Sequence, residues 1–283
     1  PILQFAANPK AHNPILPNKR KINKISFAGS YYGNRHEERR KDMNQMLRVC
    51  KTFGLDIYDR NYELNKKGKT DFSFPEEFQE NVVGSLKYQQ IDKAYKDYKV
   101  ILNVNSVKNS PTMFSRRVFE GLACGTPIIS SYSKGIEETF GDIVLISEDE
   151  NELKKSLNEL LTNMKTYREV AIKGIREVFR HHTYRNRLEF ILNTLNIPTV
   201  KEDDSLTVLM LVENMDEFNL AKELIKEQSL NNFKTIIIVS EFDHHEKLIE
   251  ENKSEELTVH TLSSLQQYDS VQEFVSTSYV TIM

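Results

Sequence analysis

The sequence predicts an α/β fold in which parallel sheets form two consecutive domains. Short apolar segments typical of buried strands alternate with amphipathic helical patterns along the chain, which favours parallel α/β units. A strand at residues 24–29 runs into a glycine loop and a helix, as in the first unit of a nucleotide-binding domain. Residues 1–69 hold 15 Lys/Arg against 6 Asp/Glu, whereas residues 201–283 hold 6 against 17. This charge asymmetry predicts a domain boundary near residue 200.

Four parts are expected along the chain. Residues 1–23 carry four prolines and no sustained periodicity, which predicts a linker or an extended arm. Residues 24–197 form a Rossmann-like domain, residues 198–205 a linker, and residues 206–283 a partial α/β domain. The basic run at residues 19–21 is too short to indicate a nucleic-acid partner. The basic first third of the chain suits an anionic ligand such as phosphate, with plain solubility as the alternative.

Composition indicates which classes of protein the chain can belong to. With 28% charged and 39% hydrophobic residues the chain is globular, and no apolar run approaches the ~20 residues that a transmembrane helix needs. Cys50 and Cys124 lie in apolar helical patterns, which predicts reduced, buried thiols in a cytoplasmic protein, with a disulfide as the less favoured alternative. His181-His182 lacks the spacing of helical metal ligands, so a structural role is expected and no metal or other cofactor. The chain opens on Pro1 rather than Met, which predicts further sequence upstream.

Periodicity predicts the elements of each domain. In the first, strands are expected at 24–29, 55–58, 100–104, 128–129 and 143–146, and helices at 35–53, 87–95 and 115–123 and in three segments from 152 to 195, with a short turn at 134–135. In the second, strands are expected at 206–212, 235–239, 257–260 and 279–282, and helices at about 216–229 and 243–251.

Two polar loops follow predicted strands. Gly29 and Gly33 let backbone N–H groups approach an anion, and the following helix N-terminus adds partial positive charge. Arg35 and Arg39 lie in or beside its first turn, although either could be part of a solvated helix face. The glycine spacing is not the dinucleotide fingerprint. A second loop at residues 105–114 follows the predicted central strand, and ligands of open α/β sheets bind at the carboxyl ends of strands, so both loops are expected to face one ligand.

Residues 115–130 predict a short helix, a glycine turn and a buried strand. Val118, Phe119 and Leu122 recur at helical spacing, which places that face in the core. Glu120 lies beside this apolar seam, and a buried carboxylate needs a partner. Either a ligand hydroxyl or an arginine of the pair Arg116-Arg117 is expected to supply it.

These blocks together resemble group 1 glycosyltransferases. The resemblance covers about residues 1–195 and rests on Phe27-Ala28-Gly29-Ser30, on Gly84 before a Tyr/Ile helix, and on Arg117-Val118-Phe119-Glu120 followed by Ala123-Cys124-Gly125 and Pro127-Ile128-Ile129. The branch it resembles most is the spore-maturation (CgeB-like) one. The resemblance implies the C-terminal, donor-binding half of a GT-B fold, with an N-terminal Rossmann half for the acceptor expected upstream. It also implies a sugar-nucleotide donor, with UDP expected, and a saccharide or protein acceptor.

The resemblance also implies a site. Glu120 resembles the carboxylate that holds the ribose hydroxyls, Gly29-Ser30 with Arg35 or Arg39 resembles the diphosphate loop, and the segment from Gly84 to Tyr88 would lie beside the base. The loop at residues 109–115 would line phosphates and sugar. The implied nucleotide-sugar residues are Gly29, Ser30, Arg35, Arg39, Gly84, Tyr88, Ser110, Thr112, Ser115, Arg116, Arg117 and Glu120, and no catalytic residue is assigned.

Alternatives remain open. Related enzymes carry a second glutamate where this chain has Thr112, which leaves the sugar contacts and retaining chemistry open. A non-catalytic scaffold derived from a transferase is the rival class. A dinucleotide oxidoreductase ranks last, since Asp56 and Asp59 lie near the required spacing but the glycine fingerprint is absent. Residues 206–283 resemble the opening of a family 2 (GT-A) glycosyltransferase, with a small α/β packing domain as the alternative.

Overall fold

The structure is a computed structural model that describes residues 2–15, 21–68, 70–199, 204–240 and 245–283. The chain divides into two compact units, Pro1–Pro198 and Thr199–Met283, and each is described by itself. Four expectations fall partly outside the described residues: the arm or linker at 1–23, the basic run at 19–21, the linker at 198–205 and the start of the helix expected at 243–251.

The first unit is built on a six-stranded, all-parallel sheet in the order β3-β2-β1-β4-β5-β6. This arrangement confirms the predicted Rossmann-like α/β class. Strand order reverses between β1 and β4, and such a switch point opens a crevice at the carboxyl ends of the strands. The strands are β1 (Ile22–Gly29), β2 (Leu55–Asp59), β3 (Val82–Gly84), β4 (Tyr98–Asn103), β5 (Ile128–Ser130) and β6 (Leu145–Ile146).

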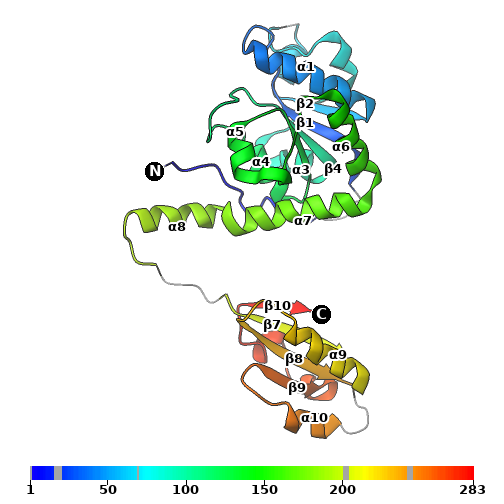
Figure 1. Ribbon diagram of the computed structural model, residues 1–283, viewed down its shortest axis with the longest axis vertical. Helices are drawn as coiled ribbons and strands as arrows, with labels where there is room; N and C mark the ends of the chain where they lie inside the picture. The colour runs from blue at the N-terminus through cyan, green and yellow to red at the C-terminus, as the bar shows by residue number, and fades with distance from the viewer. Residues whose placement is uncertain (1, 16–20, 69, 200–203, 241–244) are drawn as a thin grey trace. The chain divides into compact units, whose positions relative to one another are not determined.

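Helices cover both faces of this sheet (Figure 1). On one face, Met43 and Leu47 of α1 (Glu37–Thr52) and Leu157 of α6 (Glu150–Thr162) share a core with Phe27 and Leu102. On the other face the core joins α3 (Asp92–Lys96), α4 (Arg117–Ala123), α5 (Lys134–Phe140) and α7 (Met164–His181) to β4 and β5. The remaining helical elements of this unit are α2 (Tyr62–Asn65), η1 (Glu76–Asn81), η2 (Tyr88–Gln90), η3 (Gly141–Ile143) and α8 (Tyr184–Thr194).

Two local predictions in this unit are wrong, and one strand was not predicted. The turn expected at 134–135 is the start of α5, because Ser133 caps the helix by accepting from the Ile136 backbone N–H and Ile136 and Phe140 are both buried. The single helix expected at 87–95 is divided into η2 and α3. Residues 82–84, predicted only to precede that helix, form edge strand β3 against β2.

The N-terminal segment, expected to be a linker or an arm, contributes to the first unit. Ala6 and Ala7 are buried, and Ala7 forms a parallel bridge with Thr183. The Ala7 N–H donates to the His182 carbonyl at 2.8 Å, and the Tyr184 N–H donates to the Ala7 carbonyl at 3.0 Å. Residues around Ala7 are therefore fixed against the junction of α7 and α8. Elsewhere in the unit, Cys50 and Cys124 are buried free thiols, as predicted.

The second unit is a four-stranded parallel sheet in the order β10-β7-β8-β9. Val208, Met210 and Ile237 pack against Phe218 and Leu248 from its helices, as expected for a parallel α/β unit. Its elements are β7 (Leu206–Val212), α9 (Met215–Lys226), β8 (Phe233–Val239), α10 (His245–Glu251), β9 (Leu257–Thr261), α11 (Leu262–Leu265), η4 (Val271–Glu273) and β10 (Tyr279–Ile282). Within the described parts of both units, no helix is long and apolar enough to cross a membrane.

The close packing of α4 on the sheet yields a testable prediction. A Cβ added at Gly121 would lie 2.6 Å from Ile101 Cδ1 and 3.1 Å from Ile128 Cδ1. Alanine gains about 1 kcal/mol of helix propensity, but overpacking a core costs about 1–3 kcal/mol. We therefore expect Gly121→Ala to lower the free energy of unfolding measured in urea, and the exposed control Lys155→Ala to change it by less than about 0.5 kcal/mol. A Gly121→Ala protein that is as stable as wild type would contradict the prediction.

A second prediction concerns His182, which is buried between the rings of Phe119 and Phe140. Burial and the charge of Arg187 lower the pKa of His182, and Glu177 opposes them. Below the ordinary histidine pKa of about 6.5, the unfolded chain therefore binds a proton at His182 more readily than the folded chain does. The stability that comes from keeping His182 neutral is present above that pH and is lost on acidification. The urea midpoint of unfolding should decrease less between about pH 7.5 and about pH 5.5 in His182→Gln than in wild type. Equal falls would exclude His182 as a source of acid sensitivity.

Candidate functional site

Two arginines converge on the carboxyl end of β1. Arg117, on α4, donates through Nη2 to the Ala28 carbonyl and through Nη1 to Asn103 Oδ1 at 3.0 Å. Arg39, on α1, donates to the Ser30 carbonyl at 3.1 Å. Arg60 follows β2, and its charge acts on Arg117. We call Arg39, Arg60 and Arg117 the arginine cluster.

A buried polar network fixes the position of Arg117. Asn103, at the end of β4, donates from Nδ2 to Asn105 Oδ1 and to Ser130 Oγ, both at 3.0 Å. Asn105 in turn donates to the Ser131 carbonyl at 2.9 Å. Because these amides already have partners, Asn103 Oδ1 is left to accept from Arg117. Arg117 Nε is buried and has no hydrogen-bond partner among the described residues, so one donor of the guanidinium is unused.

The arginine cluster concentrates positive charge in a poorly solvated place. Arg39 is only 8% exposed, and burial together with the charge of Arg117 lowers the pKa of Arg39. Burial also lowers the pKa of Arg117; Tyr95 and Glu120 oppose that shift and Arg60 adds to it. Among the described residues neither Arg39 nor Arg117 forms a salt bridge with a carboxylate, so the charge of the pair is uncompensated at close range.

Glu120, one turn along α4 from Arg117, lies at the centre of a second group. It is 3% exposed. The Tyr95 hydroxyl donates to Oε2 at 2.9 Å, and Arg116 Nε lies 3.4 Å from Oε1. His12 Nε2, from the N-terminal segment, lies 3.8 Å from the same Oε1. We call His12, Tyr95, Arg116 and Glu120 the glutamate cluster. Of the two expected arginine partners, Arg116 makes the ion pair with Glu120 and Arg117 turns to the strand ends.

Other predicted residues surround these groups. A Cβ on Gly29 would lie 2.9 Å from the Phe27 ring and 3.3 Å from Arg117 Nη2, so only glycine permits this approach. Gly84 ends β3 with φ +130°, a conformation that favours glycine. Tyr88 is 67% exposed, and its ring lies 5.3 Å from the Arg116 guanidinium carbon, which links the glutamate cluster to the segment after β3.

The predicted loop residues line a cavity beside the ends of β4 and α4. Thr112 and Ser115, together with Phe5 and Asn105, line this cavity of about 430 Å³. Ser110 shapes the loop, because its Oγ accepts from the backbone N–H groups of Thr112 and Met113 at 3.3 and 3.1 Å. Ser115 Oγ accepts from the Arg117 N–H at 3.3 Å, in the turn that leads into α4.

The structure distinguishes the two arginines that were offered as alternatives near the start of α1. Arg35 is exposed and forms no hydrogen bond or ion pair with the described residues, whereas Arg39 reaches the end of β1. Sequence reasoning missed His12, Arg60 and Tyr95. Arg60 has a sequence signal, since it directly follows a strand of the predicted sheet. His12 and Tyr95 have none, because their roles depend on chain segments that only folding brings together.

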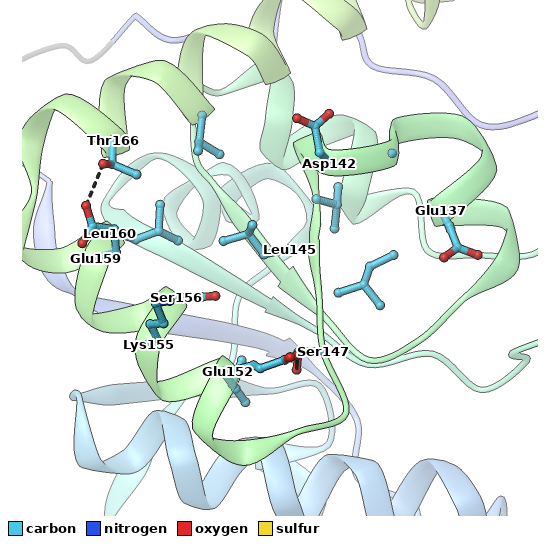
Figure 2. Close-up of a pocket in the computed structure, with 15 residues that line it drawn as sticks. Glu137, Asp142, Leu145, Ser147, Glu152, Lys155, Ser156, Glu159, Leu160 and Thr166 are labelled. Atoms are coloured by element: carbon cyan, nitrogen blue, oxygen red, sulfur yellow. Dashed lines mark hydrogen bonds between the residues drawn. The ribbon is translucent and has the colours of Figure 1, made fainter.

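A separate cavity of about 680 Å³ lies at the β6 edge (Figure 2). Leu145 points into it, Glu152 and Lys155 come from α6, and Thr166 donates to Glu159 at 2.8 Å beside it. None of the predicted site residues lines this cavity. It therefore does not belong to the arginine and glutamate clusters. In the described part of the chain, no group of three or more His, Cys, Asp or Glu side chains is placed to hold a metal ion.

Comparison with solved structures gives similarities of low sequence identity. Sucrose-phosphate synthase from Thermosynechococcus elongatus is 18% identical, with 69% of this chain and 52% of that chain covered and a TM-score of 0.47. Anabaena Alr3699/HepE, solved in complex with UDP, is 14% identical, with 62% and 49% covered and a TM-score of 0.43. The match thus spans about half the length of these two structures.

Comparison of sequences places the chain in a family. No curated protein is a significant match. The family model described as "Glycosyl transferase-like" matches residues 39–193, which hold Arg39, Arg60, Tyr95, Arg117 and Glu120. Because this match covers more than half of the 283 residues, the chain belongs to the glycosyl transferase-like family.

Proposed function

We propose that the first unit binds a sugar nucleotide and that the complete enzyme transfers the sugar to a saccharide or protein acceptor. One observation carries the proposal: Arg39 and Arg117 converge on the end of β1 without a carboxylate partner among the described residues. Two guanidinium groups held close together in a poorly solvated site repel each other, and an anion bound between them would relieve this. Guanidinium forks match phosphate oxygens in geometry, so a diphosphate is the anion of choice.

The chemistry follows from this charge. Sugar transfer from a nucleotide donor breaks the bond between the anomeric carbon and the diphosphate, and negative charge develops on the departing group. Donors already fixed in the site stabilise that charge without reorganising. Arg117 is held by Asn103 and the Ala28 carbonyl, so its positive charge is fixed beside the end of β1. Arg39 and the loop from Gly29 would complete the diphosphate site.

Glu120 would hold the ribose. An ionised carboxylate has about four acceptor positions, and the contacts from Tyr95 and Arg116 use two of them. His12 Nε2 lies 3.8 Å from Oε1, beyond hydrogen-bond distance, and occupies none of the others. The remaining positions suit two hydroxyl donors on neighbouring carbons. Tyr88 and the segment after Gly84 would then lie beside the base. We propose UDP as the nucleotide because the sequence resembles group 1 glycosyltransferases. For the same reason we propose that the protein belongs to their CgeB-like branch.

The complete enzyme would need an acceptor domain. Tyr184, Leu188, Ile191 and Leu195 recur at helical spacing along α8 and the residue after it, and all four are exposed. Such a stripe supports a further packing partner. We propose that an N-terminal Rossmann half, the other part of a GT-B enzyme, packs there. We keep two readings for residues 206–283, the opening of a GT-A-like domain and a small packing domain.

A non-catalytic scaffold is the second candidate. Thr112 stands where related enzymes have a glutamate, and Arg116 already pairs with Glu120. A domain that had lost its ligand could keep such a pair as an internal contact. The two candidates differ in nucleotide binding, which the following measurements test.

The first measurement is UDP binding by calorimetry. Loss of one charge-assisted contact costs about 1.5–3 kcal/mol, or roughly 10- to 150-fold in affinity. We expect wild type to bind UDP and Arg39→Gln to bind it at least about tenfold more weakly. Arg35→Gln is the matched control, since Arg35 is an exposed arginine near the same helix start, and it should bind as wild type does. Folded wild-type protein that binds no nucleoside diphosphate would favour the scaffold.

The second measurement separates ribose from phosphate. Glu120→Gln removes the charge of the carboxylate but keeps its size. It should therefore lower the affinity for UDP by about tenfold or more and leave the affinity for inorganic pyrophosphate nearly unchanged. Both affinities are measured by the same titration. Equal losses for the two ligands would exclude Glu120 as the ribose partner.

A further inference from the structure

The N-terminal segment enters the glutamate cluster from outside the region that the family model matches. Residues 2–15, which we call the N-terminal strap, run from the junction of α7 and α8 to Glu120. At the junction, Arg187 donates to the Gln4 carbonyl at 3.0 Å and to the Phe5 carbonyl at 2.8 Å. Beyond the bridge at Ala7, the strap forms a turn in which the Ala11 and His12 N–H groups donate to the Asn8 carbonyl at 3.0 and 2.7 Å.

This turn fixes the His12 ring. The Asn8 N–H donates to His12 Nδ1 at 3.1 Å, so Nδ1 acts as an acceptor and the proton of the neutral ring lies on Nε2. Nε2 faces Glu120 Oε1 at 3.8 Å. His12 is 7% exposed, and burial lowers the pKa of His12, against the opposing charge of Glu120. Arg116, Lys96 and Asp92 are the other charged groups that act on this ring.

We propose that His12 is a positioning residue that holds the Glu120 carboxylate in the orientation needed for the ribose. The inference rests on the proposed function. Three segments approach the carboxylate: α3 through Tyr95, the residue before α4 through Arg116, and the strap through His12. Tyr95 acts on Oε2, and the other two act on Oε1. Recognition of a vicinal diol depends on the direction of both oxygens, and neighbours of this kind preorganise a binding group.

The strap is fastened on both sides of His12. Ala6 and Ala7 are buried before it, and Lys96 donates to Asn13 Oδ1 at 3.2 Å after it. His12 is therefore held from its own segment as well as facing the carboxylate. A residue that merely filled space would need neither the Asn8 contact nor the orientation of Nε2 toward Glu120.

The test uses the whole chain and titrates UDP and inorganic pyrophosphate separately. We expect His12→Ala to lower the affinity for UDP by about tenfold and to leave the affinity for pyrophosphate unchanged. His12→Gln should restore most of the UDP affinity, since its amide can accept from Asn8 and donate toward Glu120. His181→Ala, which removes an exposed histidine, is the control and should bind both ligands as wild type does.

A double-mutant cycle with Glu120→Gln separates positioning from packing. If His12 acts through the carboxylate, His12→Ala should have little further effect on UDP in the Glu120→Gln background. Independent, additive losses would overturn the inference, as would a His12→Ala protein with normal UDP affinity or a His12→Gln protein with none of it restored. Wild type that binds no UDP would overturn the proposed function and this inference together, whereas wild-type binding without an effect of His12→Ala overturns the inference alone.

Discussion

The close approach of α4 to the sheet is the constraint on which the site depends. Gly121 has no side chain, and Ile101 and Ile128 occupy the space where a Cβ would lie. The short helix can therefore lie directly over β4 and β5, which brings Arg117 to the ends of β1 and β4 and leaves Glu120 buried one turn further on. A larger residue at 121 would push the helix outward and move both side chains together.

The buried carboxylate and the two buried guanidinium groups differ in whether an opposite charge or a hydrogen-bond donor compensates them. Glu120 is compensated, because Tyr95 and Arg116 approach its oxygens within 3.4 Å. Among the described residues, Arg39 and Arg117 contact carbonyls, an amide oxygen, the Met43 sulfur and aromatic faces, which accept hydrogen bonds or stack but carry no negative charge. A folded chain that keeps buried cations in this way gives up stability at that place, and such conflicts between local stability and charge are typical of functional sites.

The N-terminal strap shows how a segment without regular secondary structure can become part of a site. Its prolines and lack of periodicity predict no regular element, and the structure has none in residues 2–15 beyond the bridge at Ala7. Its order comes instead from partners far along the chain, Thr183 and Arg187 at one end and Lys96 and Glu120 at the other. Backbone groups that lack a sheet or helix must find such partners.

The sequence by itself determined the parallel α/β class, the first strand-loop-helix unit and the burial of Glu120, because these follow from periodicity and from glycine and proline positions that act locally. It left Arg35 and Arg39 equivalent, since helical spacing near a boundary does not say which arginine faces the sheet. Helix α5 and strand β3 were missed because a Ser133 cap and edge pairing with β2 outweighed weak local signals. Only the tertiary structure brought His12 and Tyr95 to Glu120 and turned Arg117 away from it, because these contacts join segments that are distant in the chain and meet only once the sheet has formed.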